Sequence, residues 1–197
     1  MSKTIKTIIS GLYAFTLSQI LLLFGRYDRK YCTGEYFSQR YFGIFSTGWQ
    51  WMVNDWRACR INRVNTEVPW PVSASIRVVC PENITFHPDD LNNFQSFGIY
   101  YQAIGPITLG HGCYIGPNVG LITANHAIGN LDEHDPAKPI VLGDRCWIGM
   151  NSVILPGVVL GDGTIVGAGS VVTKSFPEGN CVIAGNPAHI IKLFGNE

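Results

Sequence analysis

The hexapeptides LGDRCW (142–147), IGMNSV (148–153), ILPGVV (154–159), LGDGTI (160–165) and VGAGSV (166–171) follow one another without a gap. Each begins with an aliphatic residue, and in four of the five a glycine stands next. A six-residue repeat matches neither the period of a helix nor that of a strand. A chain that coils into a three-sided prism needs such a repeat, because each face takes one inward apolar residue before the next corner. The stretch therefore predicts a left-handed parallel β-helix.

The same spacing occurs further upstream, at Leu109, Ile115 and Leu121. The gap from Leu121 to Leu142 is three residues longer than three repeats, so one coil must carry an excursion. Glycine, asparagine, acidic residues and proline gather at residues 127–138 and predict an exposed polar loop there. Long polar loops on rigid scaffolds are common sites of function.

The length and the shifts in composition predict one repeat domain with an appendage. Residues 1–90 are expected to form an N-terminal helix and an aromatic cap, since tryptophan, tyrosine and arginine interleave there without a repeat. Residues 91–185 are expected to form the β-helix with its loop 127–138, and residues 186–197 a short C-terminal tail. The expected fold class is mainly all-β, with an N-terminal helical and aromatic extension.

The overall charge argues against one class of partner. The formal net charge is zero, and there is no basic stripe that could neutralise the phosphates of a nucleic acid. The six cysteines form no CxxC pair. Cys113 and Cys146 fall on inward positions of the repeat, which favours reduced thiols and a cytoplasmic protein over a disulfide framework.

The N-terminal segment is uncharged from Thr7 to Gly25, between Lys6 and Arg26. Its length approaches that of a membrane span, but polar residues interrupt it, and its large aliphatic residues fit one helical stripe. An amphipathic helix is expected. It either packs on the protein or makes a peripheral membrane contact through residues 1–25, which would place the protein at the inner face of the membrane.

Four motifs stand in order along the repeats: NVGLITANH (118–126), WIG (147–149), GAGSVVTK (167–174) and AGNPA (184–188). Together they resemble the hexapeptide-repeat acyltransferases, and within them most closely the xenobiotic, maltose and capsular-polysaccharide O-acetyltransferase branch. The resemblance covers about residues 90 to 193. It implies a homotrimer in which each active site and its acetyl-CoA channel lie in a cleft between neighbouring copies.

The resemblance aligns His126 with the catalytic histidine of the family, and the chemistry agrees. Transfer of an acetyl group from a thioester to an alcohol requires a base that removes the hydroxyl proton, and an imidazole suits that role near neutral pH. No Gly-x-Ser-x-Gly motif suggests an acyl-enzyme, so direct transfer is expected. A γ-type carbonic anhydrase would use the same coil with zinc, but the spacing of the histidines argues against it, and no metal is expected.

The remaining site residues follow partly from the resemblance and partly from the chemistry of their side chains. Residues expected to contact acetyl-CoA are Trp147, Ala168, Thr173, Lys174, His189 and Lys192. His189 and Lys192 stand where relatives often carry arginine, and neither reproduces its planar, bidentate group. Residues expected to contact the acceptor are Tyr101, Gln102, Asn118, Asn125 and His134. Asn118 is equally well explained as a corner residue, and His134 as a solvated loop residue.

The sequence therefore predicts an acetyl-CoA-dependent O-acetyltransferase that acts on a hydroxyl of a sugar or of a surface-polysaccharide precursor. Two alternatives remain open. One is an O-acetyltransferase for chloramphenicol- or streptogramin-type antibiotics, and the other is a non-enzymatic trimeric scaffold.

Overall fold

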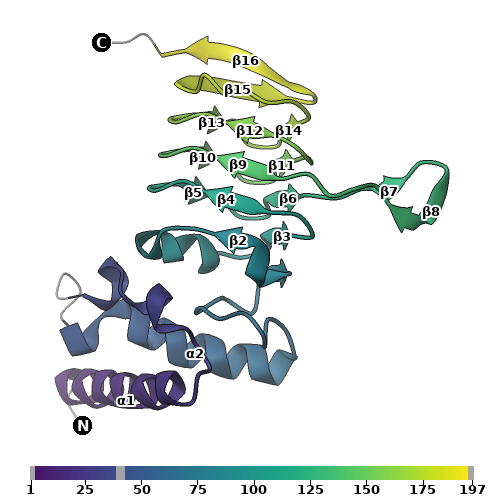
Figure 1. The fold of residues 1–197 in the computed structure, drawn as a ribbon. Helices are drawn as coiled ribbons and strands as arrows, with labels where there is room; N and C mark the ends of the chain where they lie inside the picture. Colours follow the sequence, from purple (N-terminus) through teal and green to yellow (C-terminus); the bar gives the residue numbers. More distant parts are fainter. Residues whose placement is uncertain (1–2, 39–42, 195–197) are drawn as a thin grey trace. The chain divides into compact units, whose positions relative to one another are not determined.

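The computed structural model describes residues 3–38 and 43–194, and the chain divides into two compact units (Figure 1). The first unit comprises Met1–Ala74 and His87–Gln95, and the second comprises Ser75–Phe86 and Ser96–Glu197. The parts of the predicted cap and tail at residues 1–2, 39–42 and 195–197 lie outside the described residues. Helices make up 30% of the chain and strands 26%, so the expectation of a mainly all-β fold is corrected by the size of the helical unit.

The first unit is helical and has an aromatic core of its own. Its elements are α1 (Lys3–Leu23), η1 (Arg29–Cys32), η2 (Glu35–Phe37), η4 (Gly43–Phe45), α2 (Thr47–Asn62) and η6 (Pro88–Phe94). Trp70 is fully buried and packs edge-on against Tyr31 and Phe94, with ring centroids 5.0 and 5.1 Å away. Buried aromatic pairs of this geometry add to the stabilisation from their buried area. The aromatic residues seen in the sequence thus form the interior of this unit.

The second unit is a stack of short strands that form three sheets, which we call faces 1, 2 and 3. Face 1 contains β1 (Arg77–Val79), β3 (Tyr100–Gln102), β6 (Gly120–Ile122), β11 (Val153–Ile154) and β14 (Val171–Val172). Face 2 contains β2 (Ile84–Thr85), β4 (Ile107–Leu109), β9 (Ile140–Leu142) and β12 (Val159–Leu160). Face 3 contains β5 (Tyr114–Ile115), β10 (Trp147–Ile148), β13 (Ile165–Val166), β15 (Cys181–Gly185) and β16 (Ala188–Leu193). The short helix η5 (Pro81–Asn83) lies between β1 and β2, and a separate pair, β7 (His126–Ala127) and β8 (Asn130–His134), lies between β6 and β9.

The chain runs from face 2 to face 3 to face 1 in each complete coil, so these faces are built from parallel strands one coil apart. The exception is β16, which runs antiparallel to β15. This arrangement fits the left-handed β-helix that the six-residue repeat predicts.

The six-residue repeat specifies the core. Its aliphatic positions Leu142, Ile148, Ile154, Leu160, Val166 and Val172 are all buried. Ile148 lies in register with Val166 on one side and with Ile115 on the other, so equivalent positions of successive coils stack directly. The predicted inward positions of Cys113 and Cys146 are also buried, and all six cysteines are free in the structure.

The glycine that follows the aliphatic residue is required by the close approach of the next coil, and not by a positive backbone φ. A Cβ atom added to Gly149 would lie 2.6 Å from the backbone nitrogen of Ala168 in the next coil. Successive coils approach too closely there for any side chain. Positive φ occurs instead at the later corner positions of the repeat, for example at Asn118 and Asn151.

Both ends of the predicted β-helix differ from their expected boundaries. The β-helix begins with β1 at Arg77 and not at residue 91, because β1 and β2 already pair in parallel with β3 and β4. These first coils lack the repeated glycines and so carry a weak sequence signal. The predicted tail contains β16, which pairs with β15 and closes face 3.

Candidate active site

A two-stranded arm, residues 123–138, leaves the β-helix at the corner between faces 1 and 2 (Figure 1). Its backbone partners, from root to tip, are Thr123 with Lys138, Asn125 with Asp135, His126 with His134, and Ala127 with Asn130. The root is closed by the N–H of Lys138, which donates to the carbonyl of Thr123 at 2.8 Å. The polar loop expected at residues 127–138 is therefore the tip and the returning strand of a hairpin that begins four residues earlier, at Thr123.

Gln102 fixes the root of the arm. Its side-chain oxygen accepts a hydrogen bond from the backbone N–H of Ala124 at 3.1 Å, and its carbonyl accepts one from the Thr123 hydroxyl at 2.6 Å. The same hydroxyl accepts a bond from the N–H of Gly105 at 2.9 Å. The Gln102 side chain was predicted to contact the acceptor. In this structure its oxygen accepts a hydrogen bond from the arm and so helps to hold the arm in place.

His126 lies at the start of β7, on the exposed surface of the arm. Its Nδ1 atom is 2.7 Å from the carbonyl oxygen of Leu131, and its ring lies 4.3 Å from that of His134, tilted by 34°. A carbonyl oxygen can only accept, so this contact assigns the proton of the neutral imidazole to Nδ1. The lone pair is then on Nε2. The backbone of the arm thus sets both the orientation and the tautomer of His126.

A cavity of about 420 Å³ opens at the root of the arm. Its lining residues are Asn125, Asp135, Pro136, Lys138, Leu155, Pro156 and Thr173. Asn125 was predicted to contact the acceptor and Thr173 to contact acetyl-CoA, and the structure brings the two together although they are 48 positions apart in the sequence. They meet because the corner between faces 1 and 2 recurs once per coil, so Thr173 lies in the same column as the arm.

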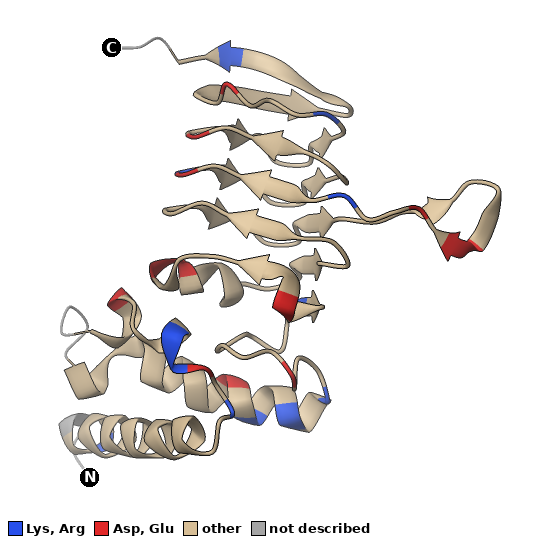
Figure 2. Ribbon diagram, viewed as in Figure 1, with Lys and Arg blue, Asp and Glu red and all other residues tan. Residues whose placement is uncertain are grey.

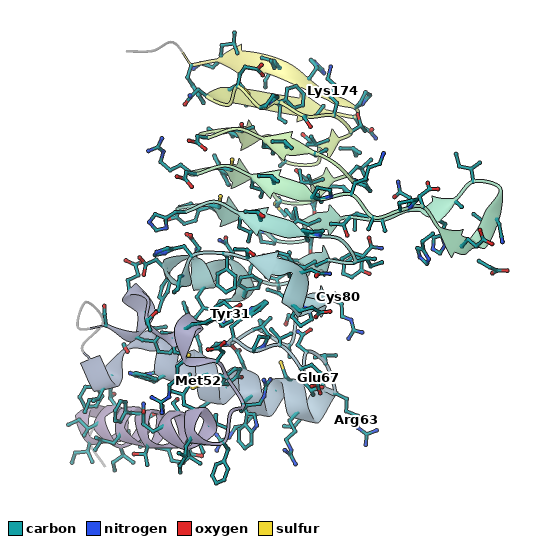
Figure 3. The ribbon with its side chains drawn as sticks, in the orientation of Figure 1. Tyr31, Met52, Arg63, Glu67, Cys80 and Lys174 are labelled. Carbon is teal, nitrogen blue, oxygen red and sulfur yellow. The ribbon has the colours of Figure 1, made fainter. Side chains whose placement is uncertain are left out.

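The other predicted cofactor residues are spread over the β-helix. Lys174, which is labelled in Figure 3, follows Thr173 at the same corner. Its Nζ lies 5.7 Å from the centre of the Phe176 ring. Trp147 is exposed on β10, and His189 and Lys192 lie on β16, all three on face 3. Ala168 lies between β13 and β14, at the corner between faces 3 and 1. Within one chain these residues do not form a single pocket with Thr173.

Two predicted acceptor contacts have structural explanations. Tyr101 is fully buried opposite Leu121, and burial, followed by the electrostatic influence of the neighbouring Cys113, raises its pKa above the usual range. The prediction that Tyr101 contacts the acceptor is therefore wrong, because its position in β3 faces inward. Asn118 adopts a φ of 56° at the corner between faces 3 and 1, and its Nδ2 donates to Asn151 Oδ1 at 3.1 Å. This geometry supports the corner interpretation of Asn118.

Sequence reasoning missed five residues that line the cavity: Asp135, Pro136, Lys138, Leu155 and Pro156. Asp135 and Lys138 bring one acidic and one basic side chain to the cavity. A signal was available for them, because both are charged residues within the predicted loop. Leu155 and Pro156 had no comparable signal, since they belong to a hexapeptide that otherwise follows the repeat.

The comparison with known families identifies the repeat. Residues 139–174 match the family described as bacterial transferase hexapeptide (six repeats). These residues form most of two coils directly above the arm, including Trp147, Leu155 and Thr173. Residues 139–174 of the β-helix are therefore similar to the hexapeptide repeats of bacterial transferases.

Relatives of the chain carry acetyltransferase names. A protein of Dictyostelium discoideum assigned by name as an acetyltransferase is 50% identical over 51% of this chain and 54% of its own length. An Escherichia coli protein assigned by name to colanic acid biosynthesis as an acetyltransferase is 30% identical over 61% of this chain and 64% of its own. The crystal structure of a hexapeptide-repeat acetyltransferase of Vibrio cholerae, complexed with acetyl coenzyme A, is 29% identical, covers 63% of each chain and has a TM-score of 0.48. The chain spans about half the length of the first of these curated relatives.

Proposed function

We propose that this protein is an acetyl-CoA-dependent O-acetyltransferase that acts on a hydroxyl of a sugar or of a surface-polysaccharide precursor. One observation carries the proposal: His126 stands on the arm with Nδ1 bound to the Leu131 carbonyl and with Nε2 available as a base. The acetyltransferase names of the relatives support the reaction class.

In the proposed reaction, Nε2 of His126 removes the proton of the acceptor hydroxyl as its oxygen attacks the thioester carbonyl. The new carbon–oxygen bond forms and the carbon–sulfur bond breaks, so the coenzyme A thiolate leaves. The imidazolium returns its proton to that thiolate, and the histidine is neutral again. The Leu131 carbonyl accepts a hydrogen bond from Nδ1 throughout and stabilises the positive charge on the ring while it exists. No covalent acyl-enzyme and no metal enter the scheme.

The distribution of the predicted cofactor residues supports assembly of the site from neighbouring copies. Thr173 and Lys174 lie at the corner beside the arm, whereas Trp147, His189 and Lys192 lie on face 3. A channel whose two walls come from different copies of the chain would take one set from each. In this proposal acetyl-CoA lies between the corner of one copy and face 3 of the next.

The arm also supports a homotrimer. At its tip, Ile128 is 99% exposed and Leu131 is 71% exposed. Two large aliphatic side chains at the end of a projecting hairpin are costly to leave in water, and a neighbouring copy would cover them. Sedimentation equilibrium of the purified chain should give three times the monomer mass of 21.7 kDa. A monomer at micromolar concentration would contradict this assembly.

The acceptor class rests on chemistry and on one relative. The Escherichia coli relative is named for colanic acid biosynthesis, which makes a polysaccharide hydroxyl the first candidate. Asn125 and Asp135, at the cavity beside His126, offer hydrogen-bonding groups suited to a sugar. Because acetyl-CoA is the donor, the proposal places the protein in the cytoplasm.

The test is release of free thiol from acetyl-CoA by the purified protein, with a panel of sugars, glycan fragments and antibiotics as acceptors. Release with a glycan is expected, and His126→Ala should lower kcat by about 10²- to 10⁴-fold, since a general base contributes that much. His111→Ala, an exposed histidine at another corner, is the matched control and should retain activity. Release with an antibiotic alone would favour the second acceptor class. No release and no coenzyme A binding by calorimetry would overturn the enzyme proposal in favour of a trimeric scaffold.

A further inference from the structure

The outward face of α1 is mainly apolar, with the exposed Thr16 between Leu12 and Ile20. Ile5, Ile9, Leu12, Ile20 and Leu23 follow the three- and four-residue spacing of one helical stripe and are between 44 and 74% exposed. We call this set the α1 stripe. A surface helix normally turns its large apolar residues toward the core. A row of exposed apolar residues on α1 therefore indicates a binding surface.

The opposite face of α1 is the one that packs on the protein, and it combines small residues with Leu21 and Leu22 near its C-terminal end. Gly11, Ala14 and Ser18 are buried. The Ser18 hydroxyl donates to the carbonyl of Trp49 in α2 at 3.1 Å, and the Phe15 ring lies edge-on to the Trp49 ring at 5.3 Å. One side of α1 is thus packed against α2, whereas the α1 stripe on the other side is exposed.

The charged residues within α1 are basic, and so is Arg57, which bonds to it. Lys3–Leu23 contains no acidic residue, and Figure 2 shows the ribbon of α1 almost free of charge. Lys6 is exposed within the helix, whereas the Arg26 guanidinium beyond its end donates to the carbonyls of Val68 and Asn65. Tyr13, beside the stripe, bonds through its hydroxyl to the guanidinium of Arg57 on α2. An aromatic ring with a cation at the border of an apolar face is the arrangement found where proteins meet the headgroups of a bilayer.

We infer that the α1 stripe binds the surface of an anionic lipid bilayer, with α1 lying in the plane of the membrane. Among the described helices, α1 alone is long and apolar enough to be considered a span, with a mean hydropathy of 1.4 over Ile5–Leu23. A spanning orientation would remove the Ser18 and Phe15 contacts with Trp49, whereas an in-plane orientation keeps them. In-plane binding places the apolar residues at the acyl boundary and the cations among the headgroups.

The charges also favour a bilayer over a second copy of the chain as the occupant. Pairing two α1 stripes would bring Lys6 and Arg57 of one copy close to the same cations of another, with no carboxylate on α1 to compensate. Like charges at such an interface oppose association. Anionic headgroups would instead neutralise them.

The experiment is co-sedimentation of the full-length protein with phosphatidylcholine vesicles, with and without phosphatidylglycerol. Binding should be stronger to the anionic vesicles and should weaken with salt. The double variant Ile9→Asn/Leu12→Asn should lower the partition coefficient by about 100-fold, roughly tenfold for each apolar side chain removed. Ile104→Asn, a 41% exposed isoleucine in the β-helix unit, is the matched control and should bind as the parent does. Lys6→Gln should weaken binding to the anionic vesicles alone, by about fivefold.

Two results would overturn the inference. One is vesicle binding that the double variant leaves unchanged. The other is absence of vesicle binding together with a lower oligomeric mass of the double variant, which would show that the stripe is an interface between copies. Both readouts are independent of acetyl transfer, so they succeed or fail separately from the proposed function. Circular dichroism of each variant is the control for correct folding.

Discussion

Asp55 should make the helical unit less stable as the pH rises. It lies on α2, is only 8% exposed, and accepts a hydrogen bond from Gln95 Nε2 at 2.8 Å. Burial raises its pKa from 3.8 to about 7, against the smaller lowering effect of the Gln95 bond. The folded state therefore keeps a proton that the unfolded state releases, so stability is full below about pH 4 and is lost as the pH rises to about 7. At 1.36 kcal/mol for each pH unit, the loss is at most about 4 kcal/mol.

Asp55→Asn removes the charge and retains an oxygen that accepts from Gln95. The variant should match the parent at pH 4 and exceed its stability at pH 8 by up to about 4 kcal/mol. Urea unfolding followed by tryptophan fluorescence measures this, because Trp49, Trp51 and Trp56 lie in the same unit. The exposed carboxylate of Glu67 provides the control, and Glu67→Gln should keep the slope of the parent. A parent whose stability does not change between pH 4 and 7, or a slope that persists in Asp55→Asn, would refute the reasoning.

Two further substitutions test the β-helix and the cavity. Gly149→Ala should destabilise the β-helix by about 1–3 kcal/mol, because its Cβ would lie 2.6 Å from the Ala168 nitrogen. A thermal melt measures this effect. An unchanged melting temperature would mean that the coils can move apart. If the cavity beside Thr173 receives the phosphate-bearing cosubstrate, Lys138→Glu should raise KM for acetyl-CoA about tenfold, or about 1.4 kcal/mol, with little effect on kcat. Initial rates over a range of acetyl-CoA concentrations separate the two parameters, and an unchanged KM would place the coenzyme elsewhere.

The repeat could be predicted because it is a local property of the sequence. One aliphatic residue in every six identifies the inward positions, and Ile148 and Ile154 lie where that pattern places them. The first coils could not be predicted in the same way, because they lack the glycine that follows the aliphatic residue in the later repeats. Arg77 and Ile84 begin strands that only their pairing with later strands reveals.

The site was partly predictable for the same reason. His126 follows a recognisable motif, and the excursion after it was visible as extra polar residues. The inward orientation of Tyr101 depends on its register with Leu121, and the cavity around Lys138 depends on a corner two coils away. Both are contacts between distant segments, which no short window of sequence contains.

The closed root of the arm has a consequence for how such proteins diversify. The bond between Lys138 and Thr123 returns the chain to its point of departure, and Ile140 then pairs with Ile107 as if no residues had intervened. Residues could be inserted or deleted beyond this junction at little thermodynamic cost, since closure entropy grows only slowly with loop length. Natural variation can therefore lengthen, shorten or re-sequence the outer hairpin, and so change what reaches His126, while the coils beneath keep their spacing.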